Sequence, residues 1–406
     1  MKLASGIAAP WRVLAVGALL GVLTPTRVYP DSINYMNSGT SLFTSAFAAD
    51  YFWLREPLYP LLLRIVLELP PGVTIHLLPA AQGLALGAGF WLFALVARDL
   101  GLLRRPEMAS YYAFTCLLVL GYTGDVLQQT LVILAASALA WCTVRLAIAP
   151  IDRRIIFWTS ISAALAVLLS AIFLVAVALV PVATVLNPHR GGGRRAAVSI
   201  WGSGGLAIGL WTLVRLANGQ PFGLGGAAVL DRTNTTDWPL RIQAFLATFG
   251  LAPDFYDGVH FNVLSYSNVA LGLRPYFGGT PCVDADLVDL TTMPDTYLVC
   301  GSTLAPALSQ SLLQPVTTYA LVQVIVGVFA LVWAWCRTRH LALYAGVLAI
   351  TIIPCLPVAV FLADGNSRYG LPVLALSLVL TAGMAEHAVE RTRTAFAGAL
   401  SRQRIV

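Results

Sequence analysis

Acidic and arginine side chains lie at the ends of long apolar runs in this sequence, where a loop would need only small polar residues. An aspartate follows the first apolar run in YPDSINYMNSG, and charged residues recur in ADYFWLREPLYP, GYTGDVLQQTL and ADGNSRYGLPV. A carboxylate can take a proton from an attacking hydroxyl or bind a divalent cation. An arginine binds a phosphate through a fork of donors. These residue types therefore favour chemistry between a hydroxyl group and a phosphate-bearing molecule. The residues are Asp31, Asp50, Arg55, Glu56, Asp125, Asp364 and Arg368.

The composition predicts that a membrane positions these residues. The 406-residue chain is 58% hydrophobic and 11% charged, whereas a soluble domain carries roughly 25% charged residues. Apolar runs of membrane-spanning length recur along the whole chain, and backbone in lipid must form helices. We therefore expect an all-α polytopic membrane protein of about nine to eleven membrane helices. The net charge of +6 fits basic loops between spans, and we find no nucleic-acid-binding motif.

The apolar runs define the expected spans. REPLYPLLLRIVLELPPG is interrupted by prolines and predicts short interfacial helices. The run 155–186 is broken at LLSAIF and has basic clusters at both ends, so it predicts a pair of short spans or a re-entrant hairpin. The other expected spans are 8–28, 74–97, 107–123, 126–147, 196–216, 315–336, 341–362 and 370–388.

Charge is distributed unequally between the two sides of this topology. The arginine clusters fall on one side, which the positive-inside rule assigns to the cytoplasm together with both termini. Most acids fall on the other side. Because the sequence is arginine-rich with Lys2 as its only lysine, we expect the inner membrane of a bacterium, with the acids facing the exterior. The clusters are Arg98/Arg104/Arg105, Arg153/Arg154, Arg190/Arg194/Arg195 and Arg337/Arg339.

One long segment without a membrane span divides the chain into three parts. Residues 217–314 are rich in Gly, Pro, Asp and Tyr and predict an extracytoplasmic cap between an N-terminal membrane module, 1–216, and C-terminal helices, 315–406. The first outer loop, 29–73, belongs to the N-terminal module. The cap contains the two cysteines expected outside the cytoplasm, Cys282 and Cys300, for which we predict a disulfide.

Four stretches together resemble the GT-C glycosyltransferases, integral membrane enzymes that use polyprenyl-phosphate sugars. YPDSINY resembles the acid-bearing first outer loop of that family, and REPLYPLLLRIVLEL resembles its juxtamembrane helices. AALAVLLSAIFLVAVALVPVATVL resembles its broken helix pair, without the Arg-Pro often found at the break. SRYGLPVLAL resembles the Arg-Tyr-x-x-Pro start of the final helix. Protein mannosyltransferases and aminoarabinose transferases are members of this type.

The resemblance implies transfer of a sugar from a polyprenyl-phosphate carrier to a glycan, lipid or protein on the outer face, with inversion at the sugar carbon. Asp31 matches the catalytic base, and Arg368 with Tyr369 matches the group that binds the lipid-linked phosphate. Asp31 is followed by Ser32 rather than a second acid, so Asp50 or Glu56 would supply any further catalytic carboxylate. Metal dependence stays open, with Asp31 and Asp50 as candidate ligands of Mg²⁺ or Mn²⁺.

The other outer helix ends complete the expected donor site. Arg55, Asp125 and Gln128 join Arg368 and Tyr369 as candidate donor-binding residues. Two of the candidate acids also have simpler interpretations. Asp31 solvates a turn or caps a helix, and Asp125 caps a helix that begins at Val126.

Two alternative functions use other residues. A polysaccharide polymerase or ligase would depend on arginines of the outer segment, Arg232, Arg241 and Arg274. A transporter would place charges near the middle of the bilayer and often shows internal repeats, and we find neither pattern here. Arg64 and Glu68 are spaced i, i+4 and predict a local helix ion pair.

Overall fold

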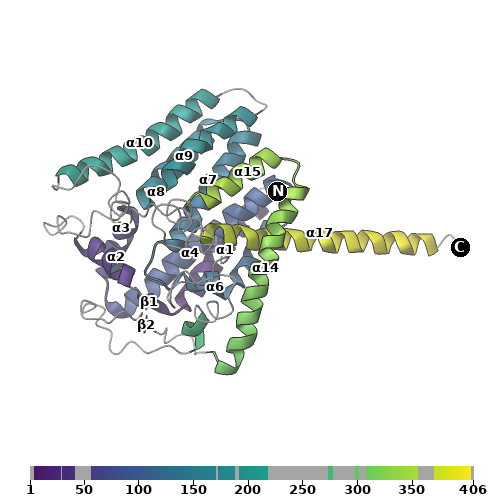
Figure 1. The fold of residues 1–406 in the computed structure, drawn as a ribbon, viewed down its shortest axis with the longest axis horizontal. Coiled ribbons are helices and arrows are strands. Elements are labelled where there is room, and N and C mark those ends of the chain that lie inside the picture. The colour runs from purple at the N-terminus through teal and green to yellow at the C-terminus, as the bar shows by residue number, and fades with distance from the viewer. Residues whose placement is uncertain are drawn as a thin grey trace, which may run out of the picture.

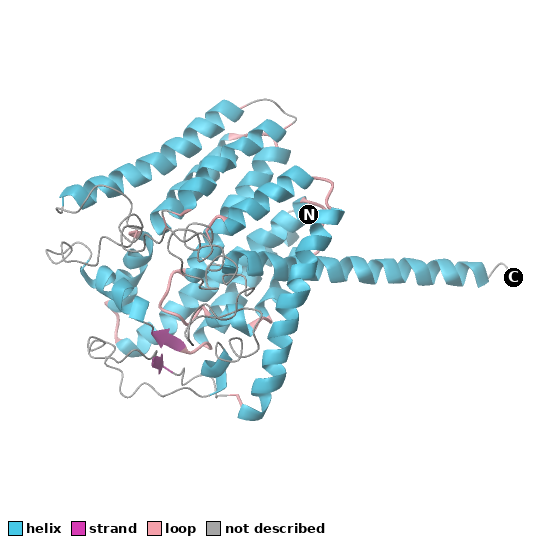
Figure 2. Cartoon of the chain, in the orientation of Figure 1, coloured by secondary structure: helices cyan, strands magenta, loops and turns pink. Residues whose placement is uncertain are grey.

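The computed structural model describes residues 4–28, 30–41, 56–170, 172–187, 192–217, 273–277, 298–300, 308–354 and 370–403. Helices make up most of these residues, and the strands described are one short antiparallel pair, β1 with β2 (Figures 1 and 2). The elements in chain order are α1 (Ala4–Val22), β1 (Thr26–Val28), α2 (Pro30–Ser41), α3 (Leu58–Leu67), α4 (Pro71–Asp99), α5 (Pro106–Phe114), α6 (Leu117–Gly121), α7 (Gln129–Ile148), α8 (Arg153–Leu169), α9 (Phe173–Leu179), the 3-10 helix η3 (Val180–Leu186), α10 (Gly193–Ala217), η4 (Arg274–Phe277), β2 (Leu298–Cys300), η6 (Gln310–Leu312), α14 (Leu313–Arg337), α15 (Leu341–Ile352) and α17 (Leu371–Gln403).

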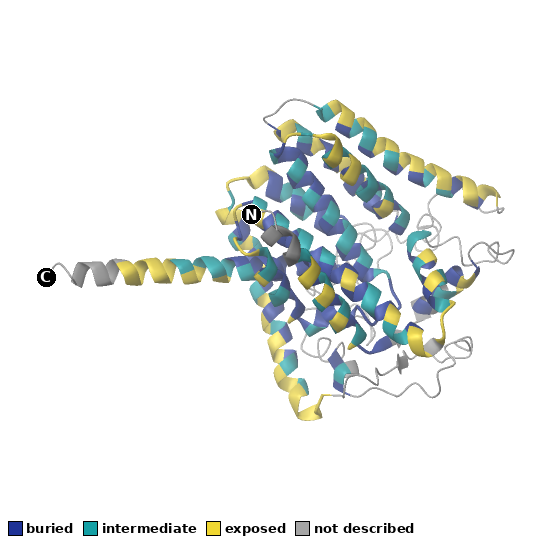
Figure 3. Cartoon of the chain, turned by 180° about the vertical axis from the view of Figure 1, so that it is seen from behind, coloured by how far each residue is buried: buried dark blue, intermediate teal, exposed yellow. Residues whose placement is uncertain are grey.

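The described part of the chain is a helical membrane protein. Five helices are long and apolar enough to cross a membrane, at 72–99, 129–148, 193–217, 310–337 and 371–397, and four shorter apolar helices accompany them, at 10–22, 58–67, 173–186 and 341–352. Large apolar side chains are exposed on α10, among them Leu206, Leu210 and Leu213, and on α14, where Phe329 is exposed (Figure 3). Such a surface suits contact with lipid rather than with water.

Small residues allow α1 and α4 to pack with their backbones almost in contact. A Cβ added at Gly17 would overlap the carbonyl oxygen of Gly83, and one added at Gly21 would overlap that of Pro79. Gly17 and Gly21 of α1 have the small-xxx-small spacing that membrane helices use for close approach. This packing holds the end of α1, and hence the chain that follows it, against the beginning of α4.

A network of ion pairs joins α4, α7 and α17 at one end of the bundle. The guanidinium of Arg98 donates to Asp99 Oδ1, and Arg145 Nη1 lies 3.7 Å from Asp99 Oδ2. The backbone N–H of Arg104 donates to Glu386 of α17 over 2.8 Å. The arginine clusters after α4 and around the end of α7 therefore lie together, as the sequence predicted.

The broken run after α7 returns to this same end. Helix α8 stops at Ser170, whose backbone is extended with φ −159° and ψ 130°. After α9 and η3, Asn187 Nδ2 donates to the carbonyl oxygens of Leu146, over 2.6 Å, and Ala149, over 2.8 Å. Both ends of the stretch 153–187 thus meet the end of α7. The return of the chain that the sequence predicted, as a pair of short spans or a re-entrant hairpin, is present; we call residues 153–187 the hairpin.

The bundle has one end rich in basic residues and an opposite end that carries acids. The rings of Trp333 and His387 are in contact, with centroids 5.5 Å apart. The end of α14 therefore lies with the ends of α4 and α7 and with α17. We call this the basic end; it comprises residues 98–105, 145–154, 187, 192–195, 333–339 and 386–390. Helices α4 and α7 run toward it and α10 runs away from it. The opposite end, which we call the acidic end, carries the positions of Asp31, Glu56 and Asp125.

Two expected spans are wrong in extent. The first, 8–28, ends as a helix at Val22, because Pro25 follows and residues 26–28 pair with β2 instead. The expected span 107–123 is two short helices broken at Thr115. The Thr115 hydroxyl donates to the Tyr112 carbonyl over 2.7 Å and competes with the helical ladder, and Cys116 is extended.

Only parts of the expected cap, 217–314, belong to the described residues. Strand β2 pairs with β1 in the register Thr26↔Cys300, so this segment contacts the chain directly before α2. Helix η4 is held against the bundle by Tyr276, whose hydroxyl donates to the Leu117 carbonyl over 3.3 Å. Whether residues 217–314 form a separate domain stays a prediction.

Candidate functional site

The turn that carries Asp125 is held by three neighbouring elements. A Cβ at Gly124 would overlap the carbonyl oxygen of Pro25, so the turn lies directly against the chain that leads into α2. Gln82 Nε2 of α4 donates to the backbone oxygen of Asp125 over 2.8 Å, and Thr130 Oγ1 of α7 donates to Gln82 Oε1 over 3.1 Å. These contacts fix Asp125, which is 1% exposed, at the acidic end.

Helices α2 and α3 meet through two tyrosines. The rings of Tyr35 and Tyr59 make an edge-to-face contact with centroids 5.1 Å apart and planes at 84°. Arg64 Nη1 of α3 also donates to the carbonyl of Thr40 in α2 over 2.5 Å. Asp31 is the second residue of α2, one turn before Tyr35, so its backbone lies at the same helix pair. The Asp31 side chain lies outside the described part of the structure.

Tyr59 brings a buried hydroxyl to this place. Its side chain is fully buried, and its Oη has no hydrogen-bond partner among the described residues. Burial raises the pKa of Tyr59, and the nearby Tyr35 and Asp125 raise it further. The phenol therefore stays protonated beside the Asp125 turn. A buried hydroxyl without a partner lowers the free energy of unfolding by roughly 1–3 kcal/mol. Such groups are therefore uncommon in folded proteins.

Arg215 is a buried cation within electrostatic range of Glu56 at the same end. Arg215 lies in the last turn of α10 and is 1% exposed, the largest of the fully buried side chains. Its charge interacts with that of Glu56, which precedes α3 and is half-buried. Helix α8 links them structurally, because it packs against both α10 and α3. The described site thus contains Glu56, Tyr59, Asp125 and Arg215, next to the backbone of Asp31.

The structure places the other expected site residues in different ways. Gln128 is half-buried and directly precedes α7, without a side-chain cap bond. The backbone of Cys300 lies in β2. Five residues fall outside the described part of the chain, and their roles stay predictions: Asp50, Arg55, Cys282, Arg368 and Tyr369.

The simpler interpretations have mixed outcomes. The local ion pair is confirmed, with Arg64 Nη2 and Glu68 Oε1 2.8 Å apart. The helix cap at Asp125 is wrong, because α7 begins at Gln129 with Gln128 as its N-cap, and the Asp125 backbone oxygen instead accepts from Leu127 N–H over 2.7 Å.

The candidate cation ligands come from the acids of the outer loop. Among the described side chains, no three His, Cys, Asp or Glu residues are grouped closely enough to hold a metal ion. The candidate ligands Asp31 and Asp50 have side chains outside that set. The cation therefore stays an expectation.

Sequence reasoning missed Arg215 and Tyr59. Arg215 is the penultimate residue of the expected span 196–216 and resembles an ordinary interfacial anchor. Its position in the sequence could have revealed it. Arg215 lies at the end of the bundle opposite the arginine clusters, where the positive-inside rule disfavours an arginine. Tyr59 has no comparable signal, since tyrosines are common at membrane interfaces.

The chain matches no protein-family model, no curated protein and no solved structure in the comparisons made with them.

Proposed function

We propose that this protein is a membrane glycosyltransferase that uses a polyprenyl-phosphate sugar. It would transfer the sugar to a glycan, lipid or protein acceptor at the acidic end. Under the positive-inside rule the basic end and both termini face the cytoplasm, and the acidic end faces the exterior. The membrane would be the bacterial inner membrane, where lipid-linked sugars and the acceptor can both reach this end.

The observation that carries the proposal is the buried Arg215 at the acidic end, within electrostatic range of Glu56. Taking charges out of water is costly, and a hydrophobic replacement would often be at least as stable. A buried arginine at the end of a membrane-spanning helix therefore favours a functional role. An arginine within electrostatic range of a carboxylate suits a substrate that carries both a phosphate and hydroxyl groups.

Each residue has a defined part in the proposed reaction. The Asp31 carboxylate takes the proton from the acceptor hydroxyl, and that oxygen attacks the anomeric carbon. The bond between this carbon and the phosphate oxygen breaks, so the configuration inverts and polyprenyl phosphate leaves. Arg368, Tyr369 and Arg215 would bind the departing phosphate, whose negative charge grows as the bond breaks.

The remaining carboxylates would act around this reaction. Glu56 and Asp50 would hold acceptor hydroxyls or supply a second carboxylate, and Arg55, Asp125 and Gln128 would line the donor site. A divalent cation bound by Asp31 and Asp50 would neutralise part of the phosphate charge. The proton transfer itself requires only the Asp31 carboxylate.

The test is transfer from radiolabelled polyprenyl-phosphate sugars to a membrane extract by purified wild type and Asp31→Asn. We expect the variant to lose about 10²–10⁴-fold in rate, the usual contribution of a general base. Asp152→Asn is the matched control, because Asp152 caps α8 by accepting from Ile155 N–H over 2.8 Å and asparagine caps equally well.

Three outcomes would contradict the proposal. Equal transfer by wild type and Asp31→Asn would remove Asp31 from the reaction. Transfer that survives this change but is lost in variants of Arg232, Arg241 or Arg274 would favour the polymerase or ligase alternative. No transfer from any donor across a broad panel would overturn the enzyme class.

A further inference from the structure

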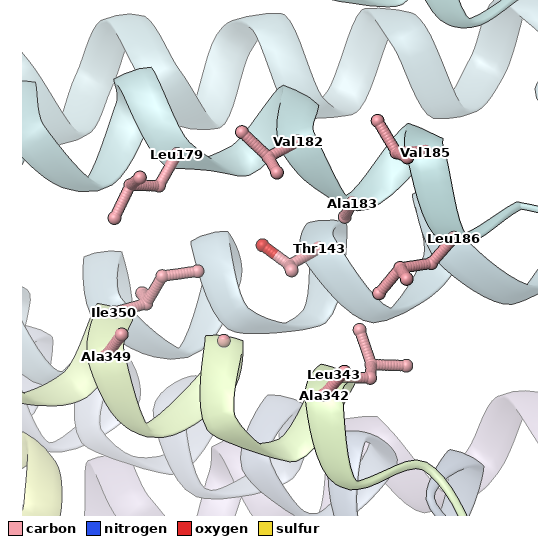
Figure 4. A pocket seen from close by; sticks show the side chains of 11 residues that line it. Thr143, Leu179, Val182, Ala183, Val185, Leu186, Ala342, Leu343, Ala349 and Ile350 are labelled. Atoms are coloured by element: carbon pink, nitrogen blue, oxygen red, sulfur yellow. The ribbon is translucent and has the colours of Figure 1, made fainter.

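A cavity opens on the side of the bundle near the basic end, away from the candidate site. Its volume is about 330 Å³, within the range of roughly 300–1,000 Å³ typical of ligand pockets. Figure 4 shows α7 as its floor, with α9 and η3 on one side and α15 on the other. Helices η3 and α15 each pack on α7 but touch one another at few residues, which leaves the space between them. The lining residues are Thr143, Leu179, Val182, Ala183, Val185, Leu186, Ala342, Leu343, Gly346, Ala349 and Ile350.

The lining of this cavity suits a hydrocarbon. All its side chains are apolar except Thr143, whose hydroxyl already donates to the Leu139 carbonyl over 2.8 Å. Val182 and Val185 on the rim are 57% and 82% exposed, so the cavity is open sideways to whatever surrounds the helices. In a membrane the surroundings are lipid chains.

The cavity extends through one leaflet. Along α15 its lining runs from Ala342 to Ile350, which spans about 12 Å at 1.5 Å per residue. The hydrocarbon core of a bilayer is about 30 Å thick, so one leaflet contributes about 15 Å. Ala342 lies near the start of α15, directly after the basic end. The cavity therefore lies in the leaflet on the side of the basic end.

Basic residues directly adjoin the elements that line the cavity. Arg339 and His340 immediately precede α15 and are exposed. Arg194 follows Gly193, at which an added Cβ would lie 3.3 Å from Thr184 of η3. Arg194 and Arg339 form no ion pair within the part of the chain that the structure describes. Each basic group near an anionic membrane surface contributes about 1 kcal/mol to lipid attraction.

We propose that this cavity binds one acyl chain of an anionic phospholipid from the leaflet at the basic end. The phosphate of the lipid lies near Arg194 and Arg339, and the chain lies between η3 and α15. The bound lipid fills the gap between the hairpin and α15. The site is separate from the acidic end and does not depend on sugar transfer.

Gly346 offers a way to close the cavity without disturbing its walls. It lines the cavity, and a Cβ added there meets no atom within 4 Å. Gly346→Phe should therefore occupy the space of the lipid chain, with Gly346→Leu as a smaller second variant. Gly209 on the exposed face of α10 also has open space around it. Gly209→Phe is thus the matched control outside the cavity.

The experiment uses phosphatidylglycerol with a photoactivatable diazirine in its acyl chain, in nanodiscs that contain the full-length protein. Crosslinked peptides are mapped by mass spectrometry. We expect crosslinks in residues 179–186 and 342–350 that fall about tenfold in Gly346→Phe, since the chain loses its apolar burial. Gly209→Phe should retain them. A phosphatidylcholine probe, or Arg194→Gln with Arg339→Gln, should lower them about fivefold.

Four results would overturn the inference. Crosslinks spread evenly over every lipid-facing helix, including α10, would show general lipid contact only. Crosslinks unchanged in both Gly346→Phe and Gly346→Leu would place the chain elsewhere. Equal labelling by the phosphatidylcholine probe would exclude the anionic head group. Displacement of the probe by a short polyprenyl phosphate, but not by unlabelled phosphatidylglycerol, would assign the cavity to the sugar carrier instead.

Discussion

Gly124 and Pro25 are in backbone contact: a Cβ on Gly124 would overlap the Pro25 carbonyl oxygen. This contact joins the Asp125 turn to the chain that leads into α2. Gly124→Ala must push the two segments apart, so we expect the free energy of unfolding to fall by about 1–3 kcal/mol, the usual cost of overpacking. Thermal or denaturant unfolding in detergent measures the change.

The control for this prediction is Gly72→Ala. A Cβ at Gly72 meets nothing within 4 Å, and the residue lies in the first turn of α4. We expect this variant to be as stable as wild type or slightly more stable, because alanine favours helix. If both variants behave alike, the contact with Pro25 does not hold the turn.

Tyr59→Phe should stabilise the protein, because it removes a buried hydroxyl without a described partner. The expected gain is about 1 kcal/mol in the free energy of unfolding at neutral pH. Tyr319→Phe is the control, since the Tyr319 hydroxyl contacts Thr115 Oγ1 at 3.0 Å and Gln323 Nε2 at 3.1 Å. That variant should lose about 0.5–1.5 kcal/mol. A loss of stability in Tyr59→Phe would mean that its hydroxyl is bonded after all.

Stability should also depend on Tyr59 at alkaline pH. The pKa of Tyr59 is raised in the folded protein, chiefly by burial. As pH rises past the unfolded value of about 10, the unfolded chain loses this proton while the folded chain keeps it, so stability falls. Unfolding free energies at about pH 8 and about pH 11 should therefore differ more in wild type than in Tyr59→Phe. Equal slopes would show that Tyr59 titrates normally.

The interaction of Arg215 with Glu56 can be measured by a double-mutant cycle. We expect the free energies of unfolding of Arg215→Met, Glu56→Gln and the double variant to give a coupling of about 1–3 kcal/mol. The exposed pair Arg64 and Glu68 supplies the reference, with an expected coupling below about 1 kcal/mol. A coupling at the acidic end no larger than this reference would remove the buried pair from the proposed site.

The hairpin predicts which residues share a side of the membrane. In a cysteine-free background, Arg154→Cys and Arg194→Cys should react with a membrane-impermeant maleimide from the same side of sealed vesicles. Gly72→Cys should react from the other side, because α4 begins at the acidic end. All three positions are exposed. Labelling of residues 154 and 194 from opposite sides would contradict the return of the chain to the end of α7.

Charge patterns predicted which helix ends lie on the same side of the membrane. The run 155–186 has arginines at both ends, which is why its return could be predicted before Asn187 was seen to bond the end of α7. Local breaks were harder. The interruption at Thr115 depends on one hydroxyl and on partners more than 200 residues away in α14, Tyr319 and Gln323, which no short pattern reveals.

The site was predictable to the extent that its members are charged. Glu56 and Asp125 were expected at one face from their places after and before apolar runs, and the structure puts them at the same end. Arg215 was missed because an arginine near the end of a span normally extends toward head groups. Its burial depends on how α8 and α10 pack. The sequence of one helix alone does not determine how two helices pack together.

The hairpin of residues 153–187 also bears on how the chain enters a membrane during synthesis. Because its two ends return to the same place, it adds no net passage through the translocon. The direction of α10, α14 and α17 is therefore set by the single-pass helices alone. Insertion of the hairpin can be delayed until α10 has emerged from the ribosome without reversing any later helix. Deleting the stretch would shorten the protein but leave its C-terminal tail in the same compartment.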